Sequence, residues 1–257
     1  MKKLIFLLFF FVIFFSCDKR SNSNNKILAF FLLQLADNAS YIIPLYSYPQ
    51  GQYQSQWEAL YNLQTLKQYF VVVNPNNGPG SSSDPNYLNA ITILKLKNFK
   101  VIGYVFTSYA VRNIAFVQND INQWFLLYGL DNVDGIFLDE VSNDNLNYSY
   151  YQNLYNYIKS FGNKEVVLNP GTNVDLNFFH IADKIIVFEN PQSSFETFVY
   201  NNYLSVDSYK VYTIVYSVPQ NKVSFVISKI LQNNSKCYYI LDKDNVTGYF
   251  YLSPYLD

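Results

Sequence analysis

Three acidic residues of this 257-residue chain stand directly after short apolar runs. Asp139 and Glu140 end the stretch Gly-Ile-Phe-Leu-Asp-Glu, and Glu189 ends Ile-Ile-Val-Phe-Glu. A carboxyl group that continues an inward apolar row is partly desolvated, which raises its pKa and suits it to exchange a proton near neutrality. If Asp139 points inward with Gly135 and Phe137, Glu140 leads the following loop and can bend over the same site. Paired carboxylates across a sugar are what glycoside hydrolysis requires, whereas single acids more often cap loops or pair with basic residues.

Other catalytic chemistries find little support in the residue types present. The chain has one histidine, His180, and two cysteines, Cys17 and Cys237, too few for a zinc site built from the usual ligands. His180 precedes an expected strand instead of following it, which argues against a Ser-His-Asp hydrolase. Neither a glycine-rich dinucleotide turn nor a Walker lysine occurs, so no cofactor is expected, although an all-oxygen calcium or magnesium site stays open. We expect Cys237, within an apolar run, to be a structural thiol.

Tyrosines and amides accompany the acids at the ends of the apolar runs. Aromatic residues make up 19% of the chain, and an aromatic face can pack on the C–H groups of a sugar while a phenol hydrogen-bonds its hydroxyls. The formal net charge is −1 with no basic run, which argues against nucleic acid as a partner. The polar and aromatic residues found at these run ends are Tyr46, Tyr48, Asn74, Tyr104, Asn169 and Tyr216.

Short apolar runs rich in β-branched and aromatic residues alternate with longer amphipathic stretches, a pattern typical of repeated βα units around a parallel sheet. We expect strands over residues 41–46, 69–73, 101–107, 135–139, 165–169, 184–189, 210–216 and 237–241. We expect helices over residues 54–67, 84–97, 112–128, 147–160, 176–179, 195–200 and 222–232. Eight strands with intervening helices in about 220 residues favour a single (β/α)8 TIM-type barrel of the α/β class, with its chemistry at the carboxyl ends of the strands.

The N-terminus has the layout of a secretory signal, in which Lys2 and Lys3 precede an apolar run that ends at Phe15. The run is too short for a transmembrane helix, so residues 1–16 are predicted to be a signal peptide. Cys17 stands where a bacterial lipoprotein carries its lipid, although plain secretion and an uncleaved anchor are alternatives. Residues 17–37 would be a lipid-anchored or flexible tether that includes an apolar segment, residues 27–37, and residues 38–257 the barrel. We expect a monomer, secreted or held at the cell surface, that touches a membrane only through this N-terminal lipid or signal anchor.

Several motifs together resemble the spherulin 4 family, glycoside hydrolase family 135. They are Pro-Leu-Tyr-Ser-Tyr-Pro at 44–49 with Trp57 after it, Val-Asn-Pro-Asn-Asn-Gly-Pro-Gly at 73–80, Gly-Tyr-Val-Phe-Thr-Ser-Tyr at 103–109, Asp-Gly-Ile-Phe-Leu-Asp-Glu at 134–140, Val-Leu-Asn-Pro-Gly-Thr at 167–172 and Val-Phe-Glu at 187–189. The resemblance implies a (β/α)8 barrel that cleaves internal bonds of an extracellular N-acetylgalactosamine polysaccharide of the galactosaminogalactan type. The last third of the chain departs more from the family pattern.

The resemblance also implies that Asp139, Glu140 and Glu189 are the active-site acids. Our hypothesis takes Glu189 as the general acid, Asp139 as the nucleophile or base, and Glu140 as a residue that binds sugar or tunes a pKa. The predicted substrate-binding residues are Tyr46, Tyr48, Asn74, Tyr104, Asn169 and Tyr216. A barrel that binds polysaccharide without cutting it is the alternative. A deacetylase or esterase is a third interpretation, and the absence from this sequence of the histidine-based site that such chemistry usually uses argues against it.

Overall fold

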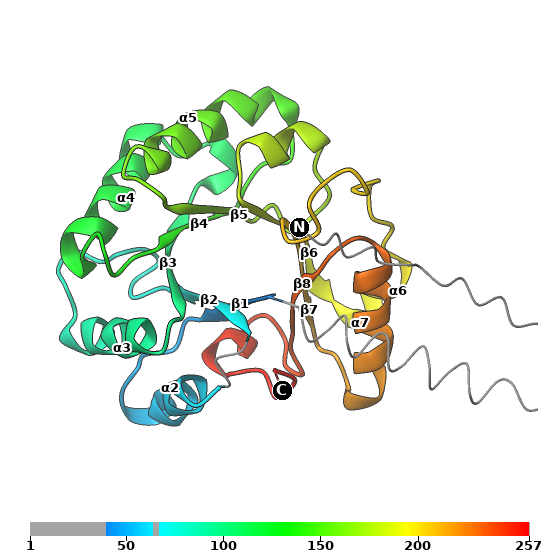
Figure 1. Ribbon diagram of the computed structural model, residues 1–257, viewed down its shortest axis with the longest axis horizontal. Coiled ribbons are helices and arrows are strands. Elements are labelled where there is room, and N and C mark those ends of the chain that lie inside the picture. The colour runs from blue at the N-terminus through cyan, green and yellow to red at the C-terminus, as the bar shows by residue number, and fades with distance from the viewer. Residues whose placement is uncertain (1–39, 64–66, 257) are drawn as a thin grey trace, which may run out of the picture.

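A computed structural model describes residues 40–63 and 67–256 of the chain. Eight strands, each parallel to its neighbours, form a closed barrel in the order in which they occur in the sequence, and the helices lie outside it (Figure 1). The strands are β1 Ser40–Leu45, β2 Gln68–Val73, β3 Lys100–Phe106, β4 Gly135–Asp139, β5 Glu165–Leu168, β6 Lys184–Pro191, β7 Val211–Tyr216 and β8 Cys237–Ile240. The predicted (β/α)8 barrel is therefore confirmed.

The α-helices are α2 Gln54–Tyr61, α3 Pro85–Leu96, α4 Ile114–Tyr128, α5 Tyr148–Lys159, α6 Gln192–Thr197 and α7 Val223–Gln232. Short 3₁₀ segments supplement them: η1 Gly51–Tyr53, η2 Ser108–Ala110, η3 Asn145–Asn147, η4 Leu176–His180, η5 Gln220–Lys222 and η6 Gly248–Phe250. Local sequence explains where the longer helices begin. The Asp84 carboxylate accepts hydrogen bonds from the first backbone N–H groups of α3, and the Asn113 side chain does the same for α4.

Three of the expected helices differ from the observed ones by two or more residues at an end. The expected helix over 54–67 ends at Tyr61, and residues 62 and 63 form a turn and a bend. The helix expected from residue 112 begins at Ile114, because Asn113 takes the capping position. The helix expected over 195–200 is found at Gln192–Thr197, after Pro191. The predicted signal peptide, lipidation site and tether, together with the apolar segment 27–37, lie outside the described residues.

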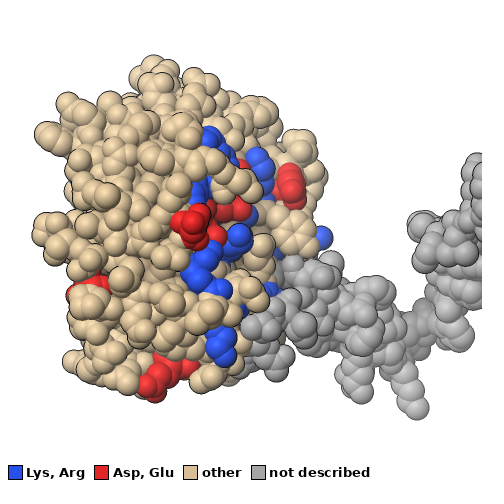
Figure 2. Space-filling view, turned by 60° about the vertical axis from the view of Figure 1, so that its left-hand side comes forward, with Lys and Arg blue, Asp and Glu red and all other residues tan. Residues whose placement is uncertain are grey.

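The amino ends of the strands are held by a repeated ionic arrangement. Asp134, just before β4, accepts a hydrogen bond from the Val101 backbone N–H of β3 at 2.8 Å and pairs with Lys95 at 2.6 Å. Asp183, just before β6, does the same with the Val166 N–H of β5 at 2.8 Å and with Lys159 at 2.6 Å. Figure 2 shows basic and acidic side chains side by side in a band on one face of the molecule. The interactions of Asp134 and Asp183 fix the register of the strands at the end of the barrel opposite the predicted site.

Buried apolar and aromatic side chains of the strands and of the surrounding helices form one continuous core. A Cβ atom added to Gly103 of β3 would come within 2.5 Å of the Trp124 ring of α4, so only glycine lets this helix lie so close to the sheet. The Trp124 indole N–H donates to the Tyr104 carbonyl at 2.8 Å. This contact fixes the backbone of β3 two residues before Phe106, its last residue.

The barrel closes between its first and last strands with little pairing. β1 is in register with β2 at six positions, but with β8 only where Ser40 lies opposite Cys237. The Ser40 hydroxyl is 2.9 Å from the Cys237 sulfur and 2.5 Å from the Tyr212 hydroxyl. Cys237 is buried and free of disulfide bonds, and burial raises the pKa of its thiol. These properties agree with a structural role for this thiol.

Two further properties of the described part of the chain bear on function. None of its helices combines the length and apolar character needed to cross a membrane. Within the same residues, no three His, Cys, Asp or Glu side chains are grouped so that they could hold a metal ion.

Candidate active site

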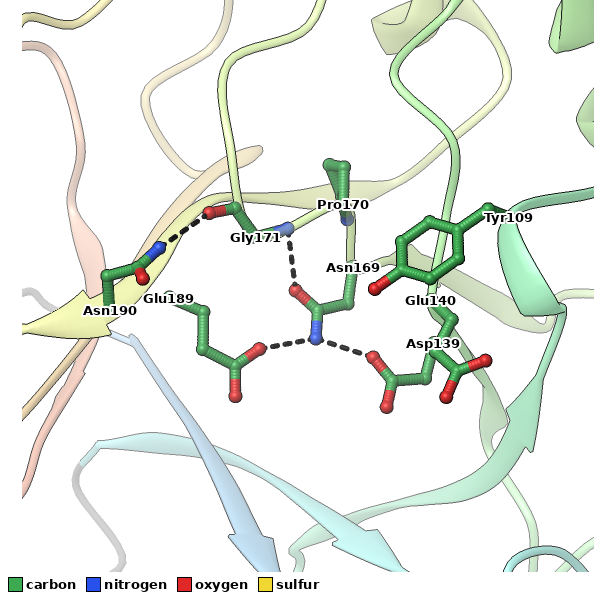
Figure 3. A pocket seen from close by; sticks show the side chains of 8 residues that line it. All are labelled: Tyr109, Asp139, Glu140, Asn169, Pro170, Gly171, Glu189 and Asn190. Atoms are coloured by element: carbon green, nitrogen blue, oxygen red, sulfur yellow. Dashed lines mark hydrogen bonds between the residues drawn. The ribbon is translucent and has the colours of Figure 1, made fainter. Parts of the chain in front are cut away.

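The three predicted acids meet in one pocket at the carboxyl ends of the strands (Figure 3). Asp139 is the last residue of β4, Glu140 follows it, and Glu189 lies near the end of β6. Glu140 adopts a φ of 51°, in the left-handed region, and this turn keeps it beside Asp139 at the rim. The pocket has a volume of about 300 Å³. Its lining residues are Tyr109, Asp139, Glu140, Asn169, Pro170, Gly171, Glu189 and Asn190.

A single amide group bridges two of the acids. The Asn169 side-chain nitrogen donates to Asp139 Oδ1 at 2.7 Å and to Glu189 Oε2 at 2.5 Å. The Gly171 backbone N–H donates to Asn169 Oδ1 at 3.1 Å, which fixes the amide orientation because only the oxygen can accept. Since the two bonds share one nitrogen, the bridged carboxylate oxygens lie within about 5.2 Å of each other. Asn169 thus sets the spacing of the acids.

The environment of both bridged acids favours their protonated forms. Burial raises the pKa of Glu189 to about 7, and the nearby Asp139 charge adds to the effect, while hydrogen bonds from Tyr249 and Asn169 oppose it. Burial also raises the pKa of Asp139, against hydrogen bonds from Tyr104 and Asn169 that stabilise its anion. Two carboxyl groups this close cannot both ionise freely, so they titrate as a pair. One proton shared between them near neutral pH is the state expected for an acid and its partner base.

Tyrosine side chains form a layer beneath the acids. The Tyr104 hydroxyl donates to Asp139 Oδ2 at 2.8 Å, and the Tyr249 hydroxyl donates to Glu189 Oε1. The Tyr46 ring lies between them, with ring centroids 5.5 Å from Tyr104 and 5.4 Å from Tyr249. Burial and neighbouring negative charge raise the pKa values of these three phenols, so they remain neutral donors at physiological pH.

A strained turn after β3 brings an aromatic side chain to the pocket. Ser108, Tyr109 and Ala110 have φ values of 47°, 54° and 69°, although none of them is glycine. The buried Thr107 hydroxyl bonds to the backbone carbonyls of Asp139 at 2.9 Å and Glu140 at 2.8 Å. The Tyr109 N–H also donates to the Glu140 carbonyl, at 2.6 Å. The turn is therefore tied to the loop that carries the acids, and it leaves the Tyr109 side chain 60% exposed at the pocket wall.

The structure does not bring all the predicted binding residues to the pocket. Asn169 lines it, and Tyr46 and Tyr104 lie beneath the acids. Burial and then the nearby Glu189 charge raise the pKa of Tyr216, at the end of β7, but this residue does not line the pocket. Tyr48 instead donates to Asp84 at 3.1 Å and accepts from Asn86 at 2.6 Å, at the start of α3.

The remaining predicted residue, Asn74, supports a loop. Its side-chain oxygen accepts a hydrogen bond from the Gly78 N–H at 2.8 Å and so shapes the turn after β2. Tyr48 and Asn74 follow strands in sequence, as site residues of a barrel do, but neither side chain is among those that line the pocket. A position after a strand predicts the correct end of the barrel without predicting the direction of the side chain.

Two tyrosines of the site were not among the predicted binding residues. Tyr109 is part of the motif at 103–109, but the position of its side chain depends on three residues with left-handed backbone. The sequence does not predict that conformation, because none of the three is glycine. Tyr249 lies in η6, after the last strand, and its backbone carbonyl accepts a hydrogen bond from the Tyr46 N–H at 2.7 Å. No local pattern marks Tyr249, because only barrel closure brings the C-terminal segment next to β1.

The carboxylate oxygens of the two bridged acids are engaged in hydrogen bonds, and the residues that the structure describes hold no group of three acids, histidines or cysteines arranged for a metal ion. The carboxylate oxygens of Asp139 and Glu189 accept hydrogen bonds from Asn169, Tyr104 and Tyr249. These donors direct hydrogen atoms at the oxygens that a calcium or magnesium ion would need. The arrangement is instead suited to moving a proton between a carboxyl group and a bound molecule.

Comparison with known proteins agrees with this architecture. A family model, Spherulation-specific family 4, matches residues 40–257. Spherulin-4 of Physarum polycephalum is 36% identical over 167 residues, which make up 64% of this chain and 47% of that protein, so the chain spans about half the length of this relative. The crystal structure of Aspergillus clavatus Sph3 in complex with GalNAc superposes with a TM-score of 0.72 at 24% identity, over 86% of this chain and 95% of that one, and supports the barrel fold. Because the family model covers the whole barrel, this chain belongs to the spherulation-specific family 4.

Proposed function

We propose that the protein is a glycoside hydrolase and that Asp139 and Glu189 are its catalytic pair. The observation that carries this proposal is the Asn169 bridge, which holds one oxygen of each acid within about 5.2 Å of the other. Retaining glycosidases place their two carboxyl groups about 5 to 5.5 Å apart, whereas inverting enzymes need about 6.5 to 9.5 Å to fit a water molecule. The limit on the nearest oxygens of Asp139 and Glu189 lies in the range of the retaining enzymes, and on this basis we propose a retaining mechanism.

Each acid has a separate role in this mechanism. Glu189, with its pKa raised to about 7, donates its proton to the glycosidic oxygen as the bond from that oxygen to C1 breaks. The Asp139 carboxylate attacks C1 and forms a glycosyl ester. Water then attacks C1, gives a proton to Glu189 and releases the sugar from Asp139. Glu140, at the rim, would bind a sugar hydroxyl and influence the charge of Asp139.

The proposed substrate is an extracellular polysaccharide that contains N-acetylgalactosamine and is cut at internal bonds. Family membership and the GalNAc named with the Aspergillus structure support this choice of sugar. The exposed Tyr109 ring beside the acids supplies an aromatic face on which a pyranose can stack. The secretory layout of the N-terminus agrees with a substrate outside the cell, with lipidation of Cys17 as the proposed means of attachment.

The proposal is tested by incubating the purified protein with partly deacetylated α-1,4-linked galactosamine polymers and analysing the products by mass spectrometry. Short oligosaccharides are expected from the wild type but not from Asp139→Asn or Glu189→Gln. Glu196→Gln, which changes an exposed carboxyl in α6, is the matched control and should cut as well as the wild type. NMR of fresh products should show the anomeric configuration of the substrate. If the wild type binds the polymer without cutting it, the protein is a binding barrel and the hydrolase proposal is wrong.

A further inference from the structure

A second groove, which we call the outer groove, lies over the loops that follow β2 and β3. Its volume is about 340 Å³, similar to that of the pocket that holds the acids. Its lining residues are Asn76, Asn77, Gly78, Pro79, Gly80, Ser81, Phe106, Arg112 and Asp120. None of these residues lines the pocket of Asp139 and Glu189, so the outer groove is a separate feature at the same end of the barrel.

The outer groove adjoins the catalytic pocket through the sheet. Phe106, the last residue of β3, is in register with Asp139 of β4. Neighbouring strands lie about 4.8 Å apart, so the two cavities begin on adjacent strands. A polymer that leaves the catalytic pocket toward β2 would therefore place its next sugar over Phe106.

One turn supplies side chains to both cavities. The Arg112 N–H donates to the Thr107 carbonyl at 3.3 Å and closes the left-handed turn over Ser108–Ala110. Tyr109 from this turn lines the catalytic pocket, while Arg112 at its end lines the outer groove. The strained backbone thus holds one wall residue of each cavity at a fixed separation.

The polar groups of the outer groove are already ordered. The Arg112 guanidinium donates to the Phe106 carbonyl at 3.0 Å and to Asp120 Oδ2 at 2.6 Å, and it lies 4.2 Å above the Phe106 ring. An arginine has five N–H donors, of which these two bonds use two. The loop on the opposite side is anchored where the Tyr128 hydroxyl donates to the Pro79 carbonyl at 3.2 Å. Binding here would therefore require little ordering of the protein.

We propose that the outer groove is a second sugar subsite, which holds the residue of the polysaccharide next to the one in the catalytic pocket. The Phe106 ring and the Arg112 guanidinium, beside the Asp120 carboxylate, fit a pyranose that has both an apolar face and hydroxyl or amino substituents. This proposal rests on the proposed glycoside hydrolase function. It gives the barrel a preference for longer chains, as cleavage at internal bonds requires.

The test compares oligosaccharides of increasing length from the same galactosamine polymer, with kcat/KM as the readout. In the wild type, kcat/KM is expected to rise when the chain becomes long enough to fill both cavities. Asp120→Asn removes the charge and keeps the shape, and Phe106→Leu keeps an apolar side chain but removes the ring. Each should lower the ratio of kcat/KM for long over short oligosaccharides by about tenfold. Asn119→Ala, at the exposed position next to Asp120 on α4, is the matched control and should keep the wild-type ratio.

The outcomes separate the two proposals. If the wild type cuts the polymer and both variants keep its length dependence, the outer groove is not a subsite although the hydrolase proposal stands. If the wild type cuts nothing, the hydrolase proposal fails, and calorimetric titration with the same oligosaccharides then tests the groove. A longer chain that binds wild type and Asp120→Asn equally well would then overturn the subsite as well.

Discussion

Replacing Glu189 with glutamine should make the protein more stable above neutral pH while it abolishes cleavage. The pKa of Glu189 is about 7 in the folded chain, against 4.5 ordinarily, because burial and the Asp139 charge disfavour its anion. The folded state therefore keeps this proton between pH 4.5 and 7 while the unfolded state releases it, and stability falls as pH rises through that window. At 1.36 kcal/mol per pH unit, the titration of Glu189 alone lowers the unfolding free energy of the wild type by about 3 kcal/mol between pH 4 and pH 8.

Glutamine avoids this loss because it has no proton to release. It can still accept the hydrogen bond from Asn169, and the Tyr249 hydroxyl can turn to accept from the new amide. Glu189→Gln should thus match the wild type at pH 4 and exceed it by about 3 kcal/mol at pH 8. Asp139→Asn should also be more stable than the wild type at pH 8, but by less than Glu189→Gln. It removes the Asp139 charge, which is the second cause of the raised pKa of Glu189, and leaves the burial unchanged.

Urea unfolding at a series of pH values from 4 to 8 measures the difference. The control is Glu196→Gln, because Lys222 and Gln192 lower the pKa of Glu196. That carboxyl stabilises the fold above its unfolded pKa, so its loss should weaken the protein at neutral pH, the opposite sign to Glu189→Gln. Wild type and Glu189→Gln with parallel stability curves across the pH range would refute the account of the raised pKa.

Three further predictions concern the same site. The wild-type pH profile of kcat/KM should be bell-shaped. The value of kcat/KM falls at low pH as Asp139 gains a proton, and it falls at high pH as Glu189, with a pKa of about 7, loses one. A flat profile between pH 4 and 8 would contradict the paired-acid mechanism. Tyr249→Phe removes a hydrogen bond that lowers the pKa of Glu189, so the alkaline limb should move to higher pH, and a shift to lower pH would contradict this. Ala110→Gly should stabilise the fold by about 1 kcal/mol in urea unfolding, because glycine adopts the φ of 69° found there without strain; a loss of stability would show that the turn is not strained.

The sequence predicted the strands well because each is a short apolar run with polar residues on both sides. It also predicted that the three acids would meet at one end of the barrel, because they come directly after such runs and parallel strands all end at one edge. The placing of Tyr48 and Asn74 was less successful, since both lie in loops where local hydrogen bonds to Asp84, Asn86 and Gly78 decide the side-chain direction.

Long-range contacts explain the rest of the difference. Tyr249 reaches Glu189 from 60 residues away in the chain, and no repeat or spacing encodes that contact. The left-handed backbone at Tyr109 could not be predicted either, because residues other than glycine occupy the turn. The sequence therefore identifies the acids of this site more readily than the tyrosines that tune them.

The sparse pairing between β1 and β8 provides a way to observe the barrel opening. Cys237 lies at this junction and is the only cysteine after Cys17 in the sequence. Its buried sulfur, close to the Ser40 hydroxyl and the Tyr209 carbonyl, can react with a thiol reagent only when the structure around this junction opens. In a chain with Cys17 replaced by serine, the rate of its modification at rising reagent concentration would therefore report how often the native barrel opens around this junction.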